Sequence, residues 1–118
     1  MIEKPTEFWV RHPVLDFIEG SSFGNVRTIK RVVIDKNGWE RIIPGKVLTP
    51  SDNGRGYLAV HFGKNGRQAI AYLHRLIAEC FIPNPNGFSE VNHKDKNPKN
   101  NCVDNLEWCS PQYNMRVS

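Results

Sequence analysis

The sequence predicts an α+β fold, in which an N-terminal antiparallel β-module precedes a strand–loop–strand–helix unit. Segments rich in β-branched residues alternate with hairpin turn signals as far as residue 73, where the apolar residues change to a helical spacing. The last third then has two short apolar segments on either side of a long polar loop. The 118 residues, 39% of them hydrophobic, suffice for one compact domain or a small domain with an extension.

The β-module is predicted from its turn signals. NVRTIKRVVID (25–35) leads into Asn37-Gly38, a strong hairpin turn, and WERII (39–43) would be the returning strand. A short strand is expected at 46–49. YLAVHF (57–62) and RQAIAYL (67–73) flank the turn Gly63-Lys64-Asn65-Gly66 and predict a second hairpin. The whole pattern is that of a β-meander.

A helix is expected next. Leu73, Leu76, Ile77, Cys80 and Phe81 have the spacing i, i+3, i+4, i+7 and i+8, which forms one apolar stripe that ends before Pro83.

The C-terminal third predicts a hairpin followed by a helix. EVNH (90–93) and LEWCS (106–110) are the expected strands, and PQYNMRVS (111–118) opens a helix with Pro111 in its first turn. The loop 94–105 between the strands is polar and twelve residues long. Loops of this length in a small domain usually have a function.

Charge is concentrated in the middle of the chain. The formal net charge is +4, but the segment Arg27–Arg75 has ten Lys and Arg against three acids, which gives 10 − 3 = +7. This asymmetry favours a surface that binds a polyanion, although a solvated surface would account for it equally well.

Other classes are disfavoured by the composition. The three cysteines lack CxxC spacing, so neither a disulfide framework nor a thiolate zinc site is expected. No apolar run approaches the roughly 20 residues of a membrane helix, and the N-terminus lacks the layout of a signal peptide. We therefore expect a cytoplasmic protein.

Four polar residues of the C-terminal third could perform chemistry together. Asn92 and His93 end the first strand, Asn105 closes the loop, and Asn114 lies one turn into the final helix. Imidazole is a base at neutral pH, and amide oxygens suit a hard divalent cation.

The string VNHKDKNPKNNCVDNLEWCSPQYN resembles the HNH motif of phage and intron-encoded homing endonucleases. The matching positions are Asn92-His93, Asp95 and Asn97, Asn100-Asn101, Asn105-Leu106-Glu107-Trp108, and Asn114. Upstream, LHRLIAECFIPNP (73–85) is similar to the helix that precedes the motif in these proteins. EFWV (7–10) and FIEGSSFGNVRTI (17–29) resemble the small β-module that often comes first.

The resemblance implies a ββα-metal nuclease domain at 57–118, after a β-rich, DNA-contacting module at 1–56. It implies that His93 is the general base, that Asn92 and Asn114 are ligands of Mg²⁺ or Mn²⁺, and that Asn105 braces the loop and orients His93. Asn92 stands where relatives often have Asp, and Lys96 where they have Gly.

The implied function is a metal-dependent DNA endonuclease that hydrolyses phosphodiester bonds and nicks one strand per active site. It would act in a bacterial or phage-infected cell as a monomer or weak dimer, with DNA as its partner and without a membrane or a small-molecule cofactor. The expected DNA contacts are basic residues: Arg27, Lys30, Arg31, Arg55, Lys64, Arg67, Lys94, Lys96 and Lys99.

The alternative is a catalytically inactive HNH scaffold that only binds DNA. A protein-interaction domain would leave the basic segment unexplained.

Several residues of the motif region are expected to be structural. We expect His74 to pack beneath the hairpin and Trp108 to lie in the core. Asn100 and Asn101 would hydrogen bond to the loop backbone. His12 and His61 are expected at the surface.

Overall fold

The computed structural model describes residues 6–64 and 66–112. The first part of the chain forms a four-stranded antiparallel sheet in the order β1-β2-β3-β6, with the following bounds: β1 (Trp9–Arg11), β2 (Ile18–Ser21), β3 (Val26–Thr28) and β6 (Lys46–Val47). β1 and β2 are short strands that the sequence patterns did not predict. The strand expected at 46–49 is present as β6.

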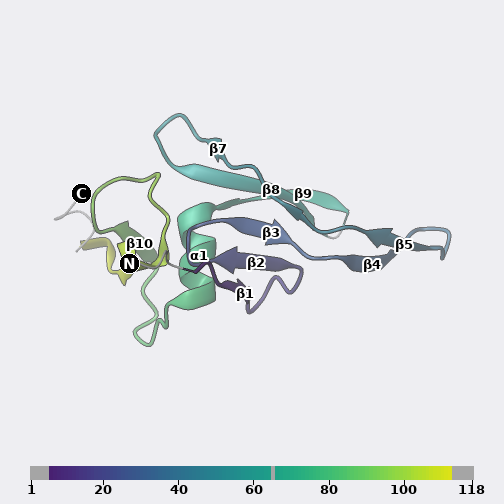
Figure 1. Ribbon diagram of the computed structural model, residues 1–118, viewed down its shortest axis with the longest axis horizontal. Coiled ribbons are helices and arrows are strands. Elements are labelled where there is room, and N and C mark those ends of the chain that lie inside the picture. The colour runs from purple at the N-terminus through teal and green to yellow at the C-terminus, as the bar shows by residue number, and fades with distance from the viewer. Residues whose placement is uncertain (1–5, 65, 113–118) are drawn as a thin grey trace.

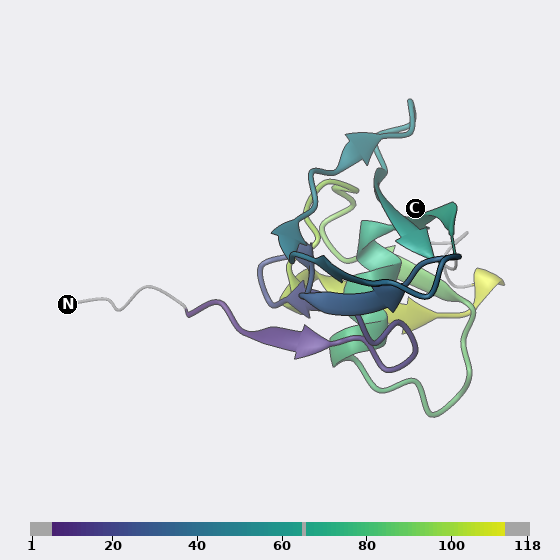
Figure 2. The ribbon, with the colours of Figure 1, turned by 90° about the vertical axis from the view of Figure 1, so that its right-hand side faces the viewer.

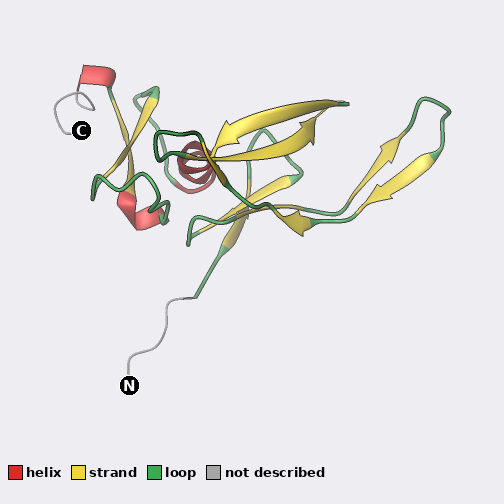
Figure 3. Ribbon diagram, turned by 90° about the horizontal axis from the view of Figure 1, so that it is seen from above, coloured by secondary structure: helices red, strands yellow, loops and turns green. Residues whose placement is uncertain are grey.

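A two-stranded ribbon, β4 (Arg31–Ile34) and β5 (Glu40–Ile43), is inserted between β3 and β6. It projects away from the rest of the molecule (Figure 1, Figure 3). Its turn contains Asn37-Gly38, as predicted, and Gly38 has φ 81°, the left-handed region that favours glycine. Because β3 pairs with β6 across this insertion, the predicted simple meander is wrong.

A third sheet leads into the helix. It contains β7 (Ser51–Asp52), β8 (Leu58–Lys64) and β9 (Arg67–Tyr72), and α1 (Leu73–Phe81) follows without a loop. The predicted second hairpin and the predicted helix are both confirmed. β10 (Glu90–His93) and β11 (Leu106–Cys109) then form the expected C-terminal hairpin, with a 3-10 turn at Val103–Asn105. A helical turn begins at residues 111–112.

One hydrophobic core joins the sheets to the hairpin through α1. Its apolar stripe (Leu73, Leu76, Ile77) is almost fully buried, as the spacing predicted. It packs with Ile18 and Val26 of the first sheet and, on the other side, with Val91 and Leu106 of the hairpin. Figure 2 shows the helix in the middle of these elements. None of the helices within the described ranges is both long and apolar enough to span a bilayer.

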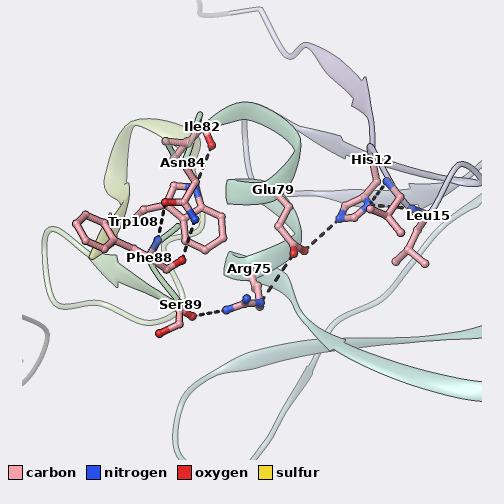
Figure 4. A network of polar contacts seen from close by, with 10 residues as sticks. His12, Leu15, Arg75, Glu79, Ile82, Asn84, Phe88, Ser89 and Trp108 are labelled. Carbon is pink, nitrogen blue, oxygen red and sulfur yellow. Dashed lines mark hydrogen bonds and ion pairs between the residues drawn. The ribbon is translucent and has the colours of Figure 1, made fainter. Parts of the chain in front are cut away.

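Polar contacts reinforce this arrangement on one side of α1 (Figure 4). His12 is 5% exposed, so its predicted surface location is wrong. Its Nδ1 accepts hydrogen bonds from the backbone N–H groups of Val14 and Leu15, so its proton lies on Nε2, which faces Glu79 Oε1 at 3.1 Å. Arg75, one turn earlier on α1, donates to the carbonyl oxygen of Ser89 just before β10. His61 is exposed, as predicted.

The β2–β3 turn packs directly against the polar loop 94–105. Val103 N–H donates to Ser22 O, and the Cys102 thiol lies 3.5 Å from Phe23 O. Gly24 has φ 88°, and a Cβ atom there would lie 2.7 Å from the backbone carbonyl atoms of Asn101. Only glycine therefore fits this turn without displacing Asn101.

His74, the second residue of α1, lies beneath the hairpin, as expected from the sequence. Its ring centroid is 4.9 Å from that of His93 and 5.6 Å from that of Tyr57. Burial, together with the nearby His93 and Arg75, lowers the pKa of His74 to about 4. His74 is therefore neutral at pH 7.

Gly24→Ala should destabilise the protein more than Gly38→Ala. Both glycines have positive φ, but no atom lies within 4 Å of a Cβ placed at Gly38. Gly38→Ala should therefore cost only the backbone strain, about 1 kcal/mol. Gly24→Ala adds overpacking against Asn101 and should cost about 2–4 kcal/mol in urea unfolding. Equal losses of unfolding free energy in the two variants would show that the turn at Gly24 is not closely packed against Asn101 of the loop.

His74 should make stability depend on pH. Because its pKa is lower in the folded state than in the unfolded state, unfolding takes up a proton below pH 6.5. The contribution of neutral His74 to the free energy of unfolding is therefore complete above pH 6.5, and it is lost as the pH falls towards 4. Between pH 7.5 and pH 5, wild type should lose about 1–2 kcal/mol more than His74→Gln in urea unfolding. His61→Gln is the exposed control and should behave like wild type. Parallel losses in wild type and His74→Gln would contradict the burial of a neutral imidazole.

Candidate active site

The β10–β11 hairpin places Asn92 and His93 on opposite faces. Asn92 is paired with Glu107 and His93 with Leu106 in the antiparallel register, and successive side chains of a strand alternate in direction. His93 contacts rings from the α1 side, whereas the Asn92 side chain meets Glu107. The side chains of Asn92 and His93 therefore lie on opposite faces of β10, although the two residues are adjacent in the sequence.

His93 is held by an asparagine of the polar loop. Its Nε2 lies 2.9 Å from Asn101 Oδ1, and the residue is only 6% exposed. The other end of this amide, Nδ2, is directed at Lys99 O at 3.5 Å, which is consistent with the oxygen facing the histidine. An amide oxygen only accepts, so the proton of neutral His93 lies on Nε2 and the lone pair on Nδ1.

Asn105 organises the loop rather than the ring. Its Oδ1 accepts from the backbone N–H of Asp95, and its Nδ2 donates to Asp95 Oδ1 and to Asn100 O. Asn100 in turn donates to Asp95 Oδ2 at 2.8 Å. The hydrogen bond from Asn100 is the main reason that the pKa of the Asp95 carboxyl is lowered, so Asp95 stays an acceptor at neutral pH. The structure thus places Asn101, not Asn105, against the His93 ring. Asn101 also contacts the loop backbone at Lys99 O, as expected, but its contact with His93 was not predicted.

The turn of this loop keeps a glycine-like conformation. Lys96 has φ 63°, and among the described residues it is the one non-glycine with positive φ. Asp95 Oδ1 accepts from the Asn97 N–H inside this turn. The backbone shape that glycine would favour is therefore kept with a lysine in place.

The Asn92 amide could hold a hard cation. Its Nδ2 donates to Glu107 Oε1 at 2.9 Å, which leaves Oδ1 as the coordinating atom. Within the described ranges, no group of three or more His, Cys, Asp or Glu residues is placed to hold a metal ion. Asn114, the second expected ligand, lies outside the described residues.

An open cavity of about 300 Å³ lies next to the rings that contact His93. Its walls include Tyr57 and His74, both in ring contact with His93, together with Tyr72, Arg55 and Arg75. The cavity offers aromatic surface and cationic groups close to the imidazole.

The basic residues singled out from the sequence differ in their surroundings. Arg27 forms an ion pair with Glu19 at 2.8 Å, and its guanidinium lies 4.0 Å from the Trp9 ring centroid. Arg31 lies over the Phe17 ring and donates to Gly63 O. Lys99 is 3.7 Å from an oxygen of Asp52. The other six belong to no ion pair of the described chain: Lys30, Arg55, Lys64, Arg67, Lys94 and Lys96.

Trp108 is partly buried against the core, as predicted, and its Nε1 donates to Ile82 O. Asn101 and Glu107, by contrast, touch His93 and Asn92 and were not assigned to the site from the sequence. Both belong to the motif string, but their roles depend on loop closure and on cross-strand register.

Comparison with known proteins identifies both parts of the chain. Residues 71–116 match the family model described as HNH endonuclease, and residues 7–63 match the NUMOD4 motif. The chain is 44% identical over 70 residues to an HNH endonuclease of Acanthamoeba polyphaga mimivirus, which covers 59% of this chain and 21% of that protein. It is 40% identical over 63 residues to the H-N-H endonuclease F-TflII of Escherichia phage T5, which covers 52% of this chain and 33% of that protein.

A solved structure has the same fold. The HNH homing endonuclease I-HmuI, whose structure addresses its DNA binding and cleavage, superposes with a TM-score of 0.71 at 27% identity. The match covers 92% of this chain and 56% of the I-HmuI chain. The chain therefore spans only part of the length of these relatives. Residues 71–116 therefore match the HNH endonuclease family model, as the motif string implied, and the relatives and the solved structure that resemble the chain are HNH endonucleases as well.

Proposed function

We propose that the chain is a metal-dependent DNA endonuclease that hydrolyses phosphodiester bonds and nicks one strand per active site. The observation that carries the proposal is the His93–Asn101 contact, because it leaves Nδ1 as the basic nitrogen of a neutral imidazole. The neutral His74 lies beside it, with the two ring centroids 4.9 Å apart.

In the proposed reaction, His93 Nδ1 takes a proton from water and the resulting hydroxide forms a bond to phosphorus. The bond from phosphorus to the leaving sugar oxygen breaks, and that oxygen takes up a proton from solvent. In-line displacement requires the nucleophile and the leaving oxygen to lie on opposite sides of phosphorus. His93 and Asn92 extend from opposite faces of β10, so a phosphate at the end of this strand would meet the base on one side and the amide oxygen on the other. By accepting a hydrogen bond from Nε2, Asn101 would hold the neutral His93 ring in the productive tautomer until Nδ1 takes up the proton.

The metal would be held by Asn92 Oδ1 and by Asn114. A bound Mg²⁺ or Mn²⁺ would neutralise charge on the phosphoryl group and the leaving oxygen. Since both protein ligands are uncharged amides, affinity for the cation should be low without DNA. Asn105 contributes indirectly, by holding the loop that presents Asn101.

DNA binding would be divided between the two parts of the chain. We assign DNA backbone contacts to the β-rich part, residues 1–56, and cleavage to residues 57–118. Arg55 of the first part and Tyr57 and Tyr72 of the second border the cavity beside His93. The match to I-HmuI supports DNA as the partner. Because one chain has one site, the monomer should nick rather than cut both strands.

Plasmid nicking tests the proposal. Supercoiled DNA should become open circular with Mg²⁺ or Mn²⁺, and EDTA should abolish the reaction. His93→Ala should reduce the rate by about 10²–10⁴, the usual loss of general-base help, while DNA binding is retained. Asn114→Ala should raise the Mg²⁺ concentration needed for half-maximal rate. His61→Ala, an exposed histidine of β8, is the control and should cleave like wild type.

Near-normal cleavage by His93→Ala would refute the assignment of the base. Metal-independent binding with no cleavage by wild type would instead favour the inactive DNA-binding scaffold.

The basic segment Arg27–Arg75 should dominate the salt dependence of binding. Lys30, Lys64 and Arg67 have no acidic partner within the described residues, whereas Lys99 lies beside Asp52 and the loop also contains Asp95. Each phosphate neutralised changes the slope of log affinity against log salt by about 0.9. The triple Gln variant at Lys30, Lys64 and Arg67 should therefore lower the slope more than the matched triple Gln variant at Lys94, Lys96 and Lys99. Arg27→Gln should have a smaller effect than Lys30→Gln, because Glu19 already compensates Arg27. A larger effect of the loop triple would make the loop the main electrostatic contact.

A further inference from the structure

We infer that Glu107 is a positioning residue, which turns the Asn92 amide so that its oxygen coordinates the catalytic cation. The inference rests on the proposed function, since it takes Asn92 as a ligand. It assigns a role to a side chain on β11, the strand paired with β10. It also explains how an uncharged amide can present its oxygen, and not its NH₂ group, to a cation.

The contact is fixed by the backbone register. Asn92 and Glu107 are direct partners across the antiparallel β10–β11 pair, so their side chains leave the same face of the hairpin. Asn92 Nδ2 donates to Glu107 Oε1 at 2.9 Å, and Asn92 is only 8% exposed. With so little water around it, the amide takes its orientation from protein partners.

The chemistry of the partner selects the orientation. The two ends of an asparagine amide have nearly the same size, but only the oxygen can bind a cation, and the NH₂ group would repel it. An ionised carboxylate is purely an acceptor, so opposite Glu107 the amide must present its nitrogen. The oxygen then faces away from Glu107, where a cation can reach it. A donor at position 107 would select the opposite, unproductive orientation.

This role exists only because residue 92 is an asparagine. The two oxygens of an aspartate are equivalent and need no partner to orient them. Removing the Glu107 carboxylate should therefore weaken cation binding in the natural chain and should not weaken it in the Asn92→Asp variant. If Glu107 were itself a ligand, its loss would weaken binding in both cases.

The test is a double-mutant cycle on Mn²⁺ affinity, measured with the full chain by the electron paramagnetic resonance signal of free Mn²⁺. Glu107→Ala should weaken Mn²⁺ binding by about 10-fold, the lower end of the range for residues that support a metal ligand. Asn92→Asp with Glu107→Ala should bind Mn²⁺ at least as tightly as Asn92→Asp alone. Glu107→Gln offers Asn92 both an acceptor oxygen and a donor NH₂ group, so it should restore only part of the affinity that Glu107→Ala loses.

A second readout follows the amide directly. In ¹⁵N-labelled protein, the side-chain NH₂ resonances of Asn92 should show the shift of a charge-assisted hydrogen bond in wild type and lose it in Glu107→Ala. The same spectra report whether each variant is folded.

Two results would overturn the positioning role while leaving nuclease activity intact. One is an equal loss of Mn²⁺ affinity when Glu107→Ala is introduced into wild type and into the Asn92→Asp variant. The other is no loss of affinity in either background. Failure of the wild-type chain to bind Mn²⁺ would overturn this inference alone, whereas failure to nick DNA with Mg²⁺ or Mn²⁺ would overturn the proposed function and this inference with it.

Discussion

The side chain of Asn105 closes the active-site loop, and the rest of the site depends on this closure. It joins Asp95, at the start of the loop, to Asn100, in the middle of the loop. The Lys94 N–H also donates to the Asn105 carbonyl oxygen. A polar loop can pack against a small core only when its groups are satisfied in this way. The closed loop places Asn101 within hydrogen-bond distance of the His93 ring, and the turn at Gly24 packs against the backbone of Asn101.

The helix α1 connects the two parts of the chain, because it packs against both the first sheet and the β10–β11 hairpin. One side of it packs on the first sheet through Ile18 and Val26, and another packs on the hairpin through Val91 and Leu106. His74, at its start, lies beneath His93. A single short helix thus sets the distance between the β-rich surface and the proposed catalytic base.

Short sequence patterns were sufficient to predict the turns, strands and helix that depend on residues close together in the chain. The hairpin turn at Asn37-Gly38, the stripe of α1 and the strands of the C-terminal hairpin depend on residues a few positions apart, and the structure contains all of them. The pairing of β3 with β6 and the burial of His12 against Glu79, 67 residues away, depend on tertiary packing that no short window contains. For the same reason, the HNH resemblance named His93 and Asn92, whereas their partners Asn101 and Glu107 became visible only once the loop and the register were in place.

The β4–β5 ribbon leaves the body of the protein through a narrow neck. A Cβ atom at Gly45 would lie 2.6 Å from the Thr28 carbonyl oxygen, so the two backbones cross there in direct contact. Beyond this crossing, Trp39 is 72% exposed, and the ribbon contributes no described residue to the hydrophobic core. Arg31, at the base of the ribbon, contacts Phe17 and Gly63, but the residues beyond it can change without removing a core contact. The β4–β5 ribbon can therefore be exchanged as a unit while the sheets around α1 stay in place. A chimaera that exchanges the ribbon should be joined at Thr28 and Gly45 rather than between residues 56 and 57.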